Sequence, residues 1–170
     1  MWVAIGAIIM MFAGLTSAYI VKSGQAAWTG VRTPVLFWYS TAVLLISSVT
    51  IQASLRAFRQ RNMSRFRSLF LLTLVLGIVF VLLQWKGFQY LWDHGVRLEG
   101  AGAGQFLYII FGLHAIHVLG GIVALVVMAL RQFFSKTRNY DSTPIEVMCT
   151  YWHFVDVLWL YLLIFFVWIG

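Results

Sequence analysis

Histidines and acidic residues stand inside long apolar stretches in the second half of the chain. His114 and His117 are three residues apart, so in a helix they share one face. His153 and Asp156 have the same spacing near the carboxyl end, and Glu146 lies seven residues before His153, on nearly the same side. Imidazoles and carboxylates placed in this way could ligate a metal ion, relay protons or bind one another across two helices.

In an apolar environment these groups are energetically unfavourable unless they are paired or hydrogen-bonded. A charge inside a membrane costs roughly 3 kcal/mol even on lenient insertion scales, so a neighbouring helix must satisfy His153 and Asp156. Counting about 1.5 Å per residue from the helix ends places His117 roughly 20 Å deep and Asp156 roughly 16 Å deep. We therefore predict that His114, His117 and Asp156 pair with one another inside the membrane. Arg131, fourteen residues beyond His117, lies within about 40° of the same face.

The sequence gives less support to a metal site. Two histidines with this spacing are common, and the carboxylate–histidine motifs of di-iron bundles do not occur as a pair. His94 belongs to a polar loop, and the single cysteine, Cys149, excludes an internal disulfide and a multi-cysteine metal site. Polar residues often fasten helices together in membranes, so we predict this role. A proton relay or a transport role stays open.

Composition places the whole chain in a membrane. Of its 170 residues 62% are hydrophobic and only 10% are charged, whereas about a quarter are charged in ordinary soluble domains. The sequence therefore predicts an all-α, polytopic membrane bundle. The net charge of +7 does not indicate a nucleic-acid partner, because the basic residues gather in loops between apolar stretches.

Five apolar stretches predict five transmembrane helices within a single domain of residues 1–170. The expected helices span residues 2–21, 34–55, 68–92, 105–130 and 145–168. A basic loop is expected between the second and third helices, with Arg56, Arg59, Arg61, Arg65 and Arg67. Pro144 suits the first turn of the last helix.

Lysine and arginine counts predict the orientation. Eight lie in loops on one side of the membrane and four on the other. The larger group is Arg56, Arg59, Arg61, Arg65, Arg67, Arg131, Lys136 and Arg138, and the smaller is Lys22, Arg32, Lys86 and Arg97. The larger group should be cytoplasmic, which puts the amino terminus inside and the carboxyl terminus outside. We expect the first stretch to be a retained helix, and the membrane to be the bacterial cytoplasmic membrane, because no signal or transit peptide is evident.

Motifs in the carboxyl-terminal half resemble a known family. They are Gly112-Leu113-His114-Ala115-Ile116-His117-Val118, then Arg131-Gln132, then Glu146, and then Tyr151-Trp152-His153-Phe154-Val155-Asp156-Val157-Leu158-Trp159. Their order and spacing closely resemble subunit III of the haem–copper oxidases, also called cytochrome c oxidase subunit 3. Phe12-Ala13-Gly14, Ser17-Ala18-Tyr19 and Ser47-Ser48-Val49-Thr50 resemble earlier helices of the same family.

The resemblance implies a non-catalytic subunit of a respiratory terminal oxidase, in the five-helix form that lacks the family's first two helices. It implies that this chain binds no cofactor, and that haem and copper lie in partner subunits I and II. It also implies bound phospholipids, support of the catalytic subunit and its proton uptake, and a possible place in a larger respiratory supercomplex. Matching motifs assign lipid or subunit contacts to Arg131, Glu146 and His153.

The chain departs from the family pattern at some positions. Ile8 stands where many relatives have a carboxylate, so a proton-supply role for that acid is not carried over. Ser54 and Leu55 replace a histidine pair. Two further functions stay open: a corresponding component of a quinol oxidase or nitric oxide reductase assembly, and an independent transporter or scaffold.

Overall fold

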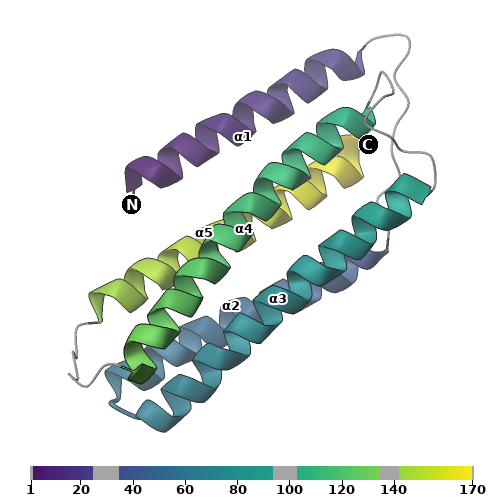
Figure 1. Ribbon diagram of the computed structural model, residues 1–170. Helices are drawn as coiled ribbons and strands as arrows, with labels where there is room; N and C mark the ends of the chain where they lie inside the picture. The colour runs from purple at the N-terminus through teal and green to yellow at the C-terminus, as the bar shows by residue number, and fades with distance from the viewer. Residues whose placement is uncertain (1, 25–34, 94–102, 135–141, 170) are drawn as a thin grey trace.

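The computed structural model describes residues 2–24, 35–93, 103–134 and 142–169, which form five α-helices and no strand (Figure 1). The helices are α1 (Trp2–Ser23), α2 (Leu36–Arg59), α3 (Met63–Asp93), α4 (Ala103–Phe134) and α5 (Thr143–Ile169). Each is long and apolar enough to cross a membrane. The predicted all-α class and the five spanning helices are therefore confirmed.

The predicted basic loop is mostly helix, and that prediction was wrong. Instead of a loop over residues 56–67, the structure leaves only residues 60–62 between α2 and α3, which begins at Met63. Arg56 and Arg59 belong to the last turn of α2. Arginine is a good helix former, and its long side chain can reach water from a helix that continues beyond the hydrocarbon.

A tight turn makes this short connection possible. Arg61 has a φ of 59°, the left-handed conformation that closes many helices. Its N–H donates to the Phe58 carbonyl at 2.9 Å, and the Asn62 N–H donates to the Ala57 carbonyl at 3.0 Å. This pair of bonds is a Schellman motif, with arginine where glycine is usual.

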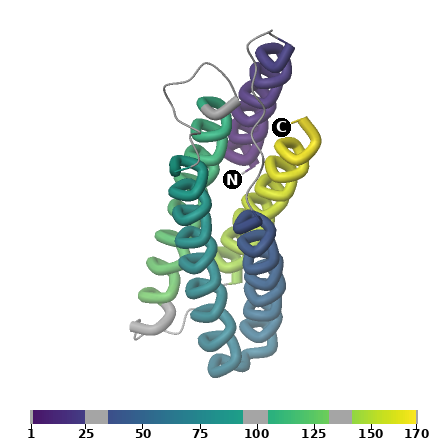
Figure 2. Tube along the Cα trace, turned by 90° about the vertical axis from the view of Figure 1, so that its right-hand side faces the viewer, coloured from purple at the N-terminus to yellow at the C-terminus, as the bar shows by residue number. Residues whose placement is uncertain are grey.

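Four helices form a closed ring, and α1 lies outside it. In the ring α2 packs on α3 and α5, and α4 completes the circuit by packing on α3 and α5. Helix α1 contacts α4 and α5 but not the α2–α3 pair (Figure 1, Figure 2). Large apolar side chains are also exposed on the outer surface, as lipid contact requires; examples are Val3, Val49, Val75, Val123 and Ile164.

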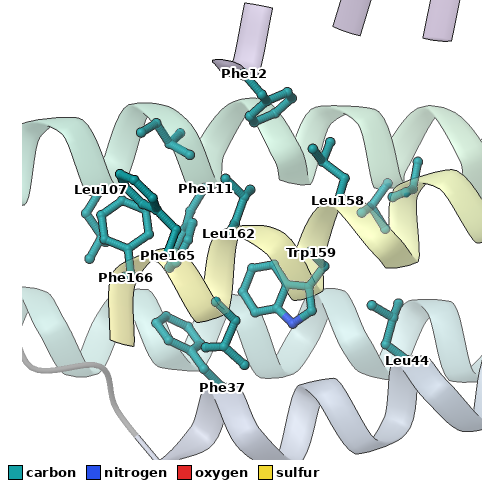
Figure 3. Packing of buried hydrophobic residues seen from close by; sticks show 14 of the residues in the cluster. Phe12, Phe37, Leu44, Leu107, Phe111, Leu158, Trp159, Leu162, Phe165 and Phe166 are labelled. Carbon is teal, nitrogen blue, oxygen red and sulfur yellow. The ribbon is translucent and has the colours of Figure 1, made fainter. Parts of the chain in front are cut away.

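Two tryptophans of α5 fill the interior of the ring. The Trp159 indole packs on Phe37 of α2, Phe80 of α3 and Phe111 of α4, with ring centroids 5.8, 5.4 and 5.1 Å away. Figure 3 shows this indole reaching from α5 toward the side where Phe37 lies. Trp152, seven residues earlier on the same face, fills the next layer. Contacts to all three other ring helices thus come from one face of α5.

Candidate functional site

Helix α2 carries a row of buried hydroxyl groups that face the interior of the ring. Its buried members are Ser40, Thr41, Ser47, Thr50 and Ser54. The Trp159 indole N–H donates to Thr41 Oγ1 at 2.9 Å, and the Trp152 indole N–H donates to Ser47 Oγ at 2.9 Å. Both core tryptophans are therefore hydrogen-bonded to α2 as well as packed against it.

The same row also binds α3. Gln84 Nε2 donates to Ser40 Oγ at 3.0 Å, and the hydroxyls of Thr50 and Thr73 share a hydrogen bond of 2.8 Å. Side-chain hydrogen bonds between membrane helices contribute about 0.6 kcal/mol on average. Helix α2 is therefore the polar connector between α3 and α5.

His153 belongs to this connection. Its Nδ1 lies 2.6 Å from Ser48 Oγ, and its Nε2 lies 3.2 Å from Gln52 Oε1. An amide oxygen only accepts, so in a neutral ring Nε2 carries the hydrogen and Nδ1 accepts from Ser48. The imidazole is half-buried, with both nitrogens bonded to α2.

His117 does not face the interior of the ring. Its Nδ1 lies 2.7 Å from the Leu113 carbonyl of its own helix, and its ring packs edge-on against Phe12 of α1, with centroids 5.9 Å apart. The Tyr151 hydroxyl donates to the His117 carbonyl at 2.9 Å. That bond connects α4 to α5 through the His117 backbone.

Among the described residues, His114 is the buried histidine and Asp156 the buried carboxylate, with exposed fractions of 1% and 4%. The His114 ring lies against Trp159, with centroids 5.2 Å apart. Neither ring nitrogen and neither carboxylate oxygen has a hydrogen-bond partner among the described residues. Ser48 is close enough to interact with Asp156 but outside hydrogen-bond geometry.

The predicted pairing of Asp156 with His114 or His117 is thus not formed by direct hydrogen bonds in the described part of the chain. Two contacts explain this. The ring of His117 is turned toward α1, and the indole of Trp159 occupies the space beside His114.

The remaining predicted residues lie at one end of the bundle. Glu146, in the first turn of α5, forms an ion pair with Arg59 of α2 at 2.9 Å and accepts a hydrogen bond from Ser142 at 2.8 Å. The ion pair is 59% and 40% exposed. Arg131 is exposed near the end of α4. The sequence pattern predicts Arg59 in the basic loop on the cytoplasmic side, but it does not predict the pairing of Arg59 with Glu146.

No group of three or more histidine, cysteine, aspartate or glutamate side chains that could hold a metal ion occurs in the described ranges. His94 lies outside them. Within the described ranges, the polar side chains of the interior connect helices or stand buried among aromatic rings.

An apolar exterior and a hydrogen-bonded interior define an integral membrane protein of the all-helical class. Residues 9–170 match the family model described as "Cytochrome c oxidase subunit III". The chain belongs to the cytochrome c oxidase subunit III family.

Alignments with known relatives cover most of the chain. It is 31% identical over 156 residues to the "Probable cytochrome c oxidase subunit 3" of Mycobacterium leprae, covering 89% of this chain and 77% of the relative. It is 34% identical over 163 residues to the "Cytochrome c oxidase subunit 3" of Corynebacterium diphtheriae, covering 92% and 80%. The "Cytochrome c oxidase subunit 3" of Anopheles gambiae is 35% identical over 150 residues, which cover 86% of this chain and 54% of that relative.

Proposed function

We propose that this chain is the non-catalytic subunit III of a respiratory cytochrome c oxidase in a bacterial cytoplasmic membrane. The observation that carries the proposal is the family match over residues 9–170, together with bacterial relatives aligned over most of both chains. Its partners would be the oxidase subunits I and II, which would hold the haems and copper.

The role proposed for the chain is to stabilise the catalytic subunit and to support its proton uptake during turnover. Polar side chains in the described interior bind neighbouring helices, as in the bonds from Trp152 and Trp159 to α2. An interior built in this way favours a rigid support over a moving transporter. The exposed apolar surface offers room for neighbouring subunits and lipid.

Phospholipid contact is proposed for the end of the bundle that carries Arg131 and Glu146. The Arg59–Glu146 ion pair is exposed there, and the arginines at the ends of α2 and α3 add positive charge. Arginine binds phosphate with two parallel hydrogen bonds, so this end suits anionic lipid head groups. His153 is half-buried on the α2–α5 seam, where a lipid chain or a partner subunit could cover it.

The same charges support the proposed orientation. Exposed arginines mark the turn between α2 and α3, and Arg131 marks the end of α4. The positive-inside rule then places these ends in the cytoplasm and the carboxyl end of α5 outside.

The test is to purify the tagged chain from its native membrane in mild detergent, and to record the optical spectrum and peptide inventory of what co-purifies. We expect haem absorbance, peptides of subunits I and II, and oxidation of reduced cytochrome c. Quinol oxidation without cytochrome c oxidation would assign the chain to a different oxidase. A stable chain without haem-bearing partners would overturn the proposal.

A further inference from the structure

The side-chain amide of Gln52 on α2 is a polar group on the outer surface of the bundle. Its Oε1 atom lies 3.2 Å from His153 Nε2 of α5 and accepts the hydrogen of that nitrogen. The two hydrogens of the amide nitrogen have no acceptor among the described residues. Gln52 and His153 are both partly exposed. The free donors of Gln52 are therefore available to a group outside the described helices.

The amide lies deep enough along the bundle to be surrounded by hydrocarbon. The exposed ion pair between Arg59 of α2 and Glu146 of α5 marks one end of the bundle. Gln52 is seven residues before Arg59, and His153 is seven residues after Glu146, so both lie roughly 10 Å from that end along the helix axes. Acyl chains offer no hydrogen-bond acceptor at this depth, and a polar group left unbonded in hydrocarbon is strongly unfavourable.

Exposed apolar side chains lie on both helices beside the amide. Leu45 and Val49 share a face of α2 with Gln52, because they are seven and three residues before it. Val157 shares a face of α5 with His153, because it is four residues after it. Helices α2 and α5 pack side by side, and α1 does not contact α2 (Figure 2). These five residues therefore form one surface, which we call the α2–α5 outer surface.

We propose that the α2–α5 outer surface binds a transmembrane helix of a partner subunit, and that this helix supplies a hydrogen-bond acceptor to the Gln52 amide. The acceptor is a hydroxyl, amide or carboxyl oxygen, because such side chains bond between helices in membranes. The apolar side chains beside Gln52 pack against the same helix. The inference rests on the proposed function for the existence of a partner, but not for which subunit it is.

Two other occupants of this surface fit less well. Phospholipid head groups lie in the interfacial region outside the hydrocarbon core, about two helical turns away from the Gln52 amide. A second copy of the chain would place the same amide donors opposite one another, and its Gln52 oxygen already accepts from His153. A helix of different sequence can present an acceptor at this level. The chemistry of the surface therefore favours a partner subunit.

Photo-crosslinking in intact cells tests the occupant. The photoreactive residue p-benzoylphenylalanine replaces Val49 or Val157, which are 69% and 64% exposed. Val75 of α3 and Val123 of α4 are the matched controls, because they are valines with exposed fractions of 54% and 62%. We expect Val49 and Val157 variants to form an adduct with an apolar, membrane-spanning peptide of another chain that contains a polar acceptor residue. The control variants should form no adduct with that peptide.

Three results of this experiment would overturn the proposal. They are adducts with lipid alone at Val49 and Val157, adducts only between two copies of the chain, and adducts with the same partner peptide at the control positions. The optical spectrum of the complex purified from the same cells separates this proposal from the proposed function. Haem-bearing partners without a protein adduct at the surface would overturn the docking surface alone. A protein adduct without haem would support the surface and overturn the oxidase assignment.

Substitution of Gln52 tests its bond to the partner separately from its bond to His153. The readout is the ratio of lost to retained subunit after the complex is washed with detergent. In a His153→Leu background, the bond to the partner is the one that Gln52→Leu can still remove. We expect a further increase of about threefold in that ratio, the size of an average side-chain bond between membrane helices.

No further loss in the His153→Leu background would show that Gln52 serves only to bond His153, and would overturn the proposed bond to a partner. If the His153→Leu background does not assemble, Gln52→Leu is introduced into the Val49 crosslinking variant instead. The yield of the partner adduct should then fall by about threefold. An unchanged yield would overturn the bond.

Discussion

At the scale of single residues, the Trp152 ring of α5 determines where the neighbouring helices α3 and α4 need glycine. A Cβ atom at Gly77 of α3 would lie 2.9 Å from the Trp152 ring, whereas at Gly112 and Gly120 of α4 it would meet nothing within 4 Å. The indole N–H of Trp152 is hydrogen-bonded to Ser47, so the ring cannot move away freely. Glycine at position 77 is thus required by packing.

We therefore expect Gly77→Ala to destabilise the subunit by about 1–3 kcal/mol, the usual range for overpacking a core. Gly120→Ala is the matched control, and it should be neutral or stabilising, because alanine is the better helix former. The measurement is the temperature at which the subunit leaves the purified complex. Equal shifts for the two variants would show that Trp152 is not held in place.

A second prediction at this scale concerns the buried hydroxyl of Thr41. Thr41→Val keeps the shape of the side chain but leaves the Trp159 indole N–H without its acceptor. Leaving a buried donor unsatisfied costs about 1–3 kcal/mol, so the dissociation temperature should fall. Thr150→Val is the control, because the Thr150 hydroxyl donates to the Glu146 carbonyl of its own helix. A loss as large in the control would contradict a specific role for the bond to Trp159.

The site shows what sequence can and cannot determine at the residue scale. Depth counting placed Asp156 and His117 near one level, but it could not show that the His117 ring turns toward α1. The direction of a ring depends on which neighbour occupies the adjacent space, and that is a property of the assembled bundle. A usable signal was missed on α2, where Ser40, Ser47 and Ser54 recur every seven residues and are fully buried.

At the scale of elements, the helices were predictable and the turn between α2 and α3 was not. Long apolar stretches fix the existence of five helices, because every backbone polar group in a membrane must bond within the chain. The arginines near residue 60 predict a long loop that the structure does not contain. Their side chains reach water from helical positions, so charge marks the membrane surface and not the helix end.

This turn yields a prediction about Arg61, which has a positive φ. Arg61→Gly and Arg61→Val both remove the guanidinium group, but only glycine adopts the left-handed region without strain. The valine variant should be less stable than the glycine variant by about 1–2 kcal/mol. Gln60 has an ordinary φ of −77°, so Gln60→Gly and Gln60→Val should not show this preference for glycine. The same ranking at both positions would contradict the strain argument.

At the scale of the whole molecule, the unequal attachment of the helices is the main feature that sequence did not reveal. All five stretches are apolar enough to cross a membrane, yet four form a ring and α1 packs on its outside. Helix α1 contributes few buried side chains, among them Phe12, Thr16 and Tyr19, and Thr16 shares a 2.9 Å hydrogen bond with Tyr161 of α5. Pairing of apolar helices depends on side-chain shape, which a hydropathy pattern does not contain.

Orientation of the whole bundle can be tested by cysteine labelling. Cys149 is buried, so Cys149→Ser provides a background in which one exposed position at a time becomes cysteine. Gln60, between α2 and α3, and Gly24, after α1, are both exposed. The turn between α2 and α3 and the carboxyl end of α1 lie at opposite ends of the bundle (Figure 1). Because arginines concentrate near Gln60, we expect that end to be cytoplasmic by the positive-inside rule.

A membrane-impermeant maleimide should therefore label Gly24→Cys in intact cells, and Gln60→Cys only after the membrane is permeabilised. This expectation follows from the charges at the two ends, since the arginines around the α2–α3 turn outnumber Lys22 at the carboxyl end of α1. Labelling of Gln60→Cys in intact cells, with Gly24→Cys protected, would show that the orientation is the opposite of the one proposed. The lipid site proposed around Arg131 and Glu146 would then face away from the cytoplasm, and the anionic lipids of the cytoplasmic leaflet could not bind there.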